Sequence, residues 1–80
     1  MNHVEIKKVA NIRDTINFNY SSNGVKSEIY GVLACITLYD ITVYVHTKDL
    51  YGYDISKTRD YSLQGITNLV NCNRDFDLGI

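Results

Sequence analysis

The segment from His46 to Arg59 gathers side chains that could recognise an anionic ligand. Lysine and arginine neutralise phosphate, and the arginine guanidinium can hold it through two parallel hydrogen bonds. Tyrosine rings stack on bases, a contact worth ~1–3 kcal/mol per base in single-strand binders. The segment therefore predicts a binding site for a nucleotide or another small anionic molecule. Its candidate residues are His46, Lys48, Tyr51, Tyr53, Lys57 and Arg59, with the hydroxyls of Thr47, Ser56 and Thr58 among them.

The same segment also fits a simpler interpretation as a solvated surface loop. Asp49, Asp54 and Asp60 are interspersed with its cations, and exposed pairs of opposite charge contribute little net stability. His46 has the chemistry of a general base or a pH switch, but no partner constellation accompanies it in the sequence. Both interpretations of the segment stay open.

The charge balance of the chain argues against several classes of function. Its 80 residues carry 8 basic and 9 acidic side chains, for a formal net charge of −1. A general nucleic-acid binder needs a clear basic excess, and no apolar stretch here reaches the length of a membrane helix. Charged residues follow Met1 closely, without a signal peptide, so we expect a cytoplasmic protein.

Cysteine and histidine are too sparse for a metal site or a disulfide framework. Cys35 lies in an apolar run, which predicts a buried reduced thiol, and Cys72 lies between two asparagines. His3 and His46 are far apart, and no CxxC motif occurs. Nucleophile elbows, phosphate-cradling glycine loops and paired carboxylate motifs are also missing. We therefore expect a non-enzymatic protein with no cofactor and no metal.

Alternating apolar and polar residues predict strands in the first half of the chain. Residues 15–20 alternate strictly and lead into Asn23-Gly24, the strongest short hairpin signal because both positions tolerate positive φ. Residues 25–38 are rich in β-forming side chains but long for one strand, so a bend is expected at Gly31. The first dozen residues fit either a strand or a short helix.

The second half of the chain predicts shorter elements. A turn at 39–40 precedes an alternating strand over 41–45, and breakers over 46–57 predict a loop. Residues 59–63 alternate again, while 66–70 fit either a last strand or a helical turn. About five short strands in one domain over residues 1–80 favour a small β-barrel.

The inward-facing positions of these strands predict which residues form the core, and this core is small. A core of this size gives marginal stability, and an alternating tail over residues 73–80 could pair with a sheet edge of the same or another copy. We therefore expect a homo-oligomer. The predicted core residues are Ile16, Phe18, Leu33, Val43, Val45 and Leu63.

The order of features over residues 14–70 matches a known pattern. A strand ending in Tyr20 is followed by a glycine hairpin, a long apolar strand and the triplet Tyr39-Asp40-Ile41. A polar loop then leads to Arg59-Asp60-Tyr61-Ser62-Leu63-Gln64-Gly65-Ile66. This order resembles the WYL domain, a small SH3-like or Sm-like barrel common in bacterial transcription regulators. The resemblance implies that fold, and implies sensing of nucleic acid or nucleotide ligands through basic and aromatic residues on the barrel.

The chain departs from the WYL pattern at the positions expected to bind ligand. Asp40 replaces the middle aromatic of the triplet, and Gln64-Gly65 replaces the family's Asp-Arg pair. Arg59 is the one basic position that matches well, and the DNA-binding helix-turn-helix of the regulators is missing. The resemblance therefore supports the fold better than the ligand.

Two functions of different classes follow. The first is a stand-alone module that senses or sequesters a nucleotide or small anionic signal, as a phage-encoded protein would do against a host defence signal. The second is an inhibitor or adaptor that binds a host protein through a tyrosine-rich face or a C-terminal strand. Seven tyrosines in a chain without tryptophan favour a binding role in either case.

Overall fold

One short helix and five strands make up the fold of residues 1–48 and 50–73, the part of the chain that the computed structural model describes. The prediction of a mainly β fold with about five strands and one short helix is confirmed. The elements are α1 (His3–Val9), β1 (Thr15–Ser22), β2 (Val25–Ile36), β3 (Asp40–Lys48), β4 (Asp54–Ser62), the 3-10 turn η1 (Leu63–Gly65) and β5 (Ile66–Asn71).

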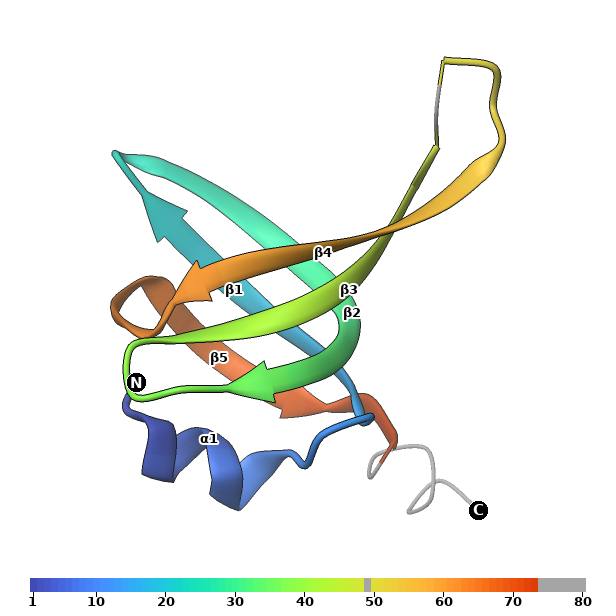
Figure 1. Cartoon of the computed structure of the whole chain (residues 1–80). Coiled ribbons are helices and arrows are strands. Elements are labelled where there is room, and N and C mark those ends of the chain that lie inside the picture. Colours follow the sequence, from blue (N-terminus) through green and yellow to red (C-terminus); the bar gives the residue numbers. More distant parts are fainter. Residues whose placement is uncertain (49, 74–80) are drawn as a thin grey trace.

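All five strands belong to one antiparallel sheet in the order β4-β3-β2-β1-β5. Strands that follow one another in sequence pair as neighbours, except that η1 carries the chain from β4 across to β5, beside β1 (Figure 1). Residues 66–70, which fitted a strand or a helical turn in the sequence, therefore lie in a strand.

The turn between β1 and β2 confirms the predicted hairpin. Asn23 and Gly24 have φ values of 52° and 79°, the left-handed conformation that a two-residue hairpin turn requires at both positions. The pairing continues from Ser22 opposite Val25 to Thr15 opposite Val32.

β2 bends near Gly31, because the two halves of this strand pair with different neighbours. Its first half pairs with β1 up to Val32, and its second half pairs with β3 from Gly31 onward. A side chain at Gly31 would clash with the backbone oxygen of Tyr44 and would lie 2.6 Å from the Cγ1 of Val43. Glycine is required here because two backbones approach closely.

The sheet curls until β1 and β4 face each other across the interior. Two strands separate β1 from β4 in the sheet, which would hold them ~14 Å apart if the sheet were flat. The ring of Tyr61 on β4 nevertheless lies 5.3 Å from that of Phe18 and 4.9 Å from that of Tyr20, edge-on in both cases. The curled sheet thereby encloses a core.

All six predicted core residues are buried, so this prediction is confirmed. Five of them lie on β1, β2 and β3, where one face of each strand lines the interior, and Leu63 lies in η1 directly after β4. The core also contains Ile6, Ala10, Ile41, Tyr61, Ile66 and Leu69.

α1 closes one end of the curled sheet. The side chain of Asn2 accepts a hydrogen bond from the N–H of Glu5 and caps the helix, and Ile6 is its fully buried residue. At the other end of the helix, the buried amide of Asn71 donates to the carbonyl of Val9 at 3.0 Å and to the carboxylate of Asp14 at 2.7 Å. Within the first dozen residues, His3–Val9 thus form a short helix, one of the two alternatives left open.

The predicted loop over residues 46–57 is wrong. β3 continues to Lys48 and β4 begins at Asp54, with His46 opposite Ser56 in the ladder. β4 is exposed on both faces over most of its length, so its side chains show no apolar alternation and the backbone pairing holds the strand instead.

The predicted burial of Cys35 is also wrong, because its thiol is exposed. The register of β2 against β3 shifts between Leu33 and Cys35, which places Cys35 opposite Thr42. Thr42 bonds to the exposed Asp60 on the outside of the sheet, and residues directly opposite share a face. The bulge therefore turns Cys35 outward.

The sequence favours Tyr20, Tyr30, Tyr39 and Tyr44 as core or rim residues rather than ligand contacts, and only one of them packs there. Tyr20 lies partly buried against the core, whereas Tyr30, Tyr39 and Tyr44 are exposed. The core tyrosine is Tyr61 instead, which leaves exposed rings available on the outside of the sheet.

Candidate functional site

The two hairpins of the sheet separate beyond Gly31 on β2 and Val45 on β3, where the β2–β3 pairing ends. The β1–β2 hairpin and the β3–β4 hairpin both continue past this point as separate arms (Figure 1). A cleft of about 350 Å³ lies at the base of the two arms. This hairpin cleft is lined by Glu28, Ile29, Tyr30, Val45, His46, Arg59 and Tyr61.

The hairpin cleft has an apolar floor that belongs to the core. Val45 and Tyr61 are buried, and Tyr61 is held edge-on by two other rings. Burial raises the pKa of the Tyr61 phenol above its ordinary value of 10.0, although the nearby charge of Arg59 acts in the opposite direction. The phenol is therefore protonated at neutral pH and can donate a hydrogen bond but cannot serve as a base.

The rim of the hairpin cleft is polar and carries charges of both signs. Arg59 lies on β4 two residues before Tyr61, so both side chains leave the same face of the strand. Glu28 accepts a hydrogen bond from the amide of Asn17 at 3.1 Å, which holds the carboxylate at the opposite wall. The ring of Tyr30 is 62% exposed. A cation, a carboxylate and an aromatic face thus surround one opening.

The structure brings together two of the six candidate site residues. His46 and Arg59 line the hairpin cleft, from neighbouring strands. Lys57 lies opposite Val45 in the ladder, on the face of β4 that carries Arg59. It lies one step further from the core and outside the cleft lining.

The other three candidate residues lie toward the tip of the β3–β4 arm. Lys48 is the last residue of β3, and the chain then turns back toward Asp54. Tyr51 and Tyr53 are 84% and 72% exposed there. Lys48, Tyr51 and Tyr53 therefore do not line the hairpin cleft with Arg59.

The wall that β2 contributes to the cleft was not predicted from the sequence. Glu28 and Tyr30 line the same cleft as Arg59 because β2 leaves β3 at Gly31. No residue spacing in the sequence indicates that β2 and β3 separate at this point. The bend predicted at Gly31 was the one available signal, since a strand that changes partners must leave an opening beside it.

The described residues hold no cluster of three or more histidine, cysteine or carboxylate side chains placed to bind a metal ion. Cys35 and Cys72 are not joined in a disulfide. No helix among residues 1–48 and 50–73 combines the length and apolar character needed to span a membrane.

No protein-family model, curated protein or solved structure matches the chain. The WYL resemblance of residues 14–70 therefore stays a prediction. Any functional conclusion depends on the geometry of the domain itself.

Proposed function

We propose that the domain is a non-enzymatic binding module that captures a nucleotide or small anionic molecule in the hairpin cleft. The supporting observation is that Arg59, His46 and Tyr30 all line one opening. The cleft volume of about 350 Å³ falls within the ~300–1,000 Å³ typical of small-molecule sites.

Each rim residue has a distinct task in this proposal. The guanidinium of Arg59 binds a phosphate or carboxylate through paired hydrogen bonds, and the exposed ring of Tyr30 stacks on a planar group. Glu28 accepts hydrogen bonds from an amino group of that planar ring, and the protonated hydroxyl of Tyr61 donates one from below. An anion joined to an aminated ring, as in a nucleotide, meets all of these groups at once.

A module of this kind would act as a sensor or as a sequestering protein. Sequestration needs only capture, which is consistent with a domain proposed to have no catalytic step. A phage-encoded protein that removes a defence signal is the biological setting that we propose for it.

Calorimetry against mono-, di- and cyclic nucleotides tests the proposal. Arg59→Ala should weaken binding by ~1.5–3 kcal/mol, the worth of a hydrogen bond to a charged group, or roughly 10- to 150-fold. The matched control is Lys26→Ala, a cation lost from β2 outside the cleft lining. Affinity should also fall as salt rises. No heat with any nucleotide, or equal losses in both variants, would refute the proposal.

A second candidate function is protein binding through a tyrosine-rich face on the outside of the sheet. Asn17 lies between Tyr30 and Val70 in the register, and Tyr44 lies opposite Val32. Tyr30, Tyr44 and Val70 are 62%, 47% and 44% exposed. Large exposed rings beside aliphatic side chains are typical of protein interfaces.

Tyr44 separates the two candidate functions, because it belongs to the tyrosine-rich face and not to the cleft lining. Tyr44→Ala should abolish the complex of an inhibitor or adaptor with its host protein and should leave nucleotide binding unchanged. Arg59→Ala should weaken nucleotide binding and should leave the complex with the host protein unchanged. The C-terminal strand that was the other expected contact, residues 74–80, lies outside the described residues.

We also propose that the domain self-associates. β4 and β5 are the outer strands of the sheet, and within the described residues each pairs with a neighbour on one side only. Strand edges of this kind are templates for pairing with another chain, and a small core gains stability from an interface.

A further inference from the structure

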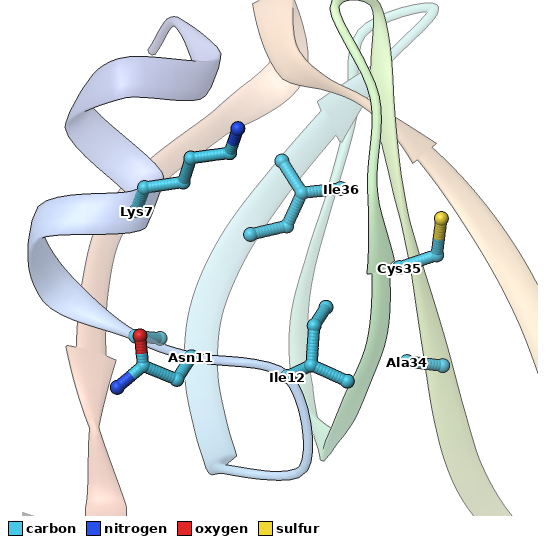
Figure 2. Close-up of a pocket in the computed structure, with 7 residues that line it drawn as sticks. Lys7, Asn11, Ile12, Ala34, Cys35 and Ile36 are labelled. Carbon is cyan, nitrogen blue, oxygen red and sulfur yellow. The ribbon is translucent and has the colours of Figure 1, made fainter.

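A second cavity lies between α1 and the second half of β2, separate from the hairpin cleft. It measures about 440 Å³, and its walls include Lys7, Ile12, Ala34 and Ile36. Figure 2 shows the side chains of Ile12 and Ile36 in the space between helix and strand, with the amine of Lys7 directed toward Ile36. This helix groove is therefore mainly apolar, with a cation at one wall.

The helix groove lies along the second half of β2, where the edge of β2 that faces β1 has no strand partner among the described residues. β1 pairs with β2 only as far as Val32, and the preceding loop continues the contact by one residue. There the N–H of Leu33 donates to the carbonyl of Asp14 at 2.9 Å, and the N–H of Arg13 donates to the carbonyl of Leu33 at 2.7 Å. Beyond Leu33, no described strand pairs with β2 on this side, an arrangement that accepts an extended segment.

The last described residue lies one strand away from β2, because the N–H of Thr15 faces β5 while the carbonyl of Asp14 in the same peptide unit faces β2. The side-chain oxygen of Asn73 accepts a hydrogen bond from the N–H of Thr15 at 3.1 Å. Thr15 lies opposite Val32, two residues along β2 from Ala34 in the groove wall. The seven residues that follow Asn73 span up to ~23 Å when extended, whereas a seven-residue helix such as α1 is only ~10 Å long.

The sequence after Asn73 complements the groove. Phe76, Leu78 and Ile80 alternate with polar positions, so an extended chain places these three apolar side chains on one face. Asp75 and Asp77 fall on the other face. Aliphatic and aromatic groups match the apolar walls, and the carboxylates match the positive charge of Lys7 at the groove.

We propose that residues 74–80 of the same chain occupy the helix groove as an extended segment beside Ala34 and Ile36. The apolar face of the segment contacts Ile12 and Ile36, and a carboxylate lies near Lys7. The groove is thereby a docking surface for the chain's own C-terminal segment, which adds a strand to the open edge of β2.

Nuclear magnetic resonance on the full chain tests this docking directly. Contacts are expected between the ring protons of Phe76 and the methyl groups of Ile12 and Ile36. Ile12→Asp should abolish them and lower the hydrogen-exchange protection of residues 75–79 by roughly tenfold or more. The matched control is Val4→Asp, since Val4 and Ile12 are 48% and 46% exposed, and it should leave both readouts unchanged.

Lys7→Glu, compared with Lys8→Glu, provides a second test that changes no apolar packing. Both side chains are exposed in the last turn of α1, but only Lys7 lines the groove. Lys7→Glu should reduce the protection of the segment more than Lys8→Glu does. The proposal is overturned if the full chain shows no contact between residues 74–80 and the groove. It is equally overturned if, in a mixture of labelled and unlabelled chains, the contacts arise only between copies.

Discussion

Replacing Gly31 by alanine tests the bend on which both the fold and the hairpin cleft depend. The new methyl group would lie 2.6 Å from the Cγ1 of Val43 and would also meet the backbone oxygen of Tyr44. The side chain of Val43 is fully buried and cannot turn aside, and the oxygen is part of the β2–β3 ladder. Relief of the clash therefore requires β2 and β3 to move apart.

The expected cost follows from these contacts. Inserting a methyl group into a packed core costs up to ~3 kcal/mol, and weakening one ladder hydrogen bond adds ~1 kcal/mol. Alanine restricts the unfolded chain more than glycine does, which offsets ~0.4–1 kcal/mol. The net loss is about 3 kcal/mol, a large share of the ~4–12 kcal/mol expected for 80 residues. At ~4–8 °C per kcal/mol, the melting temperature should fall by roughly 12–24 °C.

Thermal and urea unfolding followed by circular dichroism measures this loss. Gly52→Ala is the matched control, because Gly52 has a φ of 83° and open space around its α-carbon. It should cost only ~1–2 kcal/mol from the left-handed backbone conformation. The reasoning is refuted if Gly31→Ala is no more destabilising than Gly52→Ala. It is also refuted if the amide resonances of β2 and β3 do not shift in Gly31→Ala.

Three further predictions concern stability, pH and assembly. Asn71→Ala should lower the free energy of unfolding by about 2.5–4 kcal/mol in urea titrations, because it removes the hydrogen bonds to Asp14 and Val9. The pKa of Tyr61 is higher in the folded protein than the value of 10.0 for the unfolded chain. Above about pH 10 the unfolded chain therefore loses this proton first, and the free energy of unfolding should fall as pH rises. Tyr61→Phe should remove that decline, and urea titrations at pH 8 and pH 11 compare the two proteins. Sedimentation at high micromolar concentration should show self-association, and a monomer there would contradict it.

The strands could be predicted where one face of each lines the core. Ile16, Phe18, Val43 and Val45 repeat every second residue, and all are buried. The same principle failed over residues 46–57, because the β3–β4 arm extends beyond the core and β4 has solvent on both faces there. Backbone pairing stabilises such an arm, and pairing leaves no apolar pattern in the sequence.

The candidate site could be predicted only in part, for a related reason. His46 and Arg59 were found by residue type, and both line the cleft because β3 and β4 pair beside it. Tyr51 and Tyr53 have equally suitable chemistry but lie toward the tip of the arm. Tyr30 contributes from a strand whose distance from Arg59 depends on where β2 changes partners, which local sequence does not encode.

That change of partners also explains why β2 lines both the hairpin cleft and the helix groove. The first half of β2 pairs with β1 and leaves its other side open, which forms a wall of the hairpin cleft. The second half pairs with β3 and leaves the opposite side open, which forms a wall of the helix groove. Arg59→Ala should therefore affect only the cleft and Ile12→Asp only the groove. Gly31→Ala should disturb both, because it acts on the strand that they share.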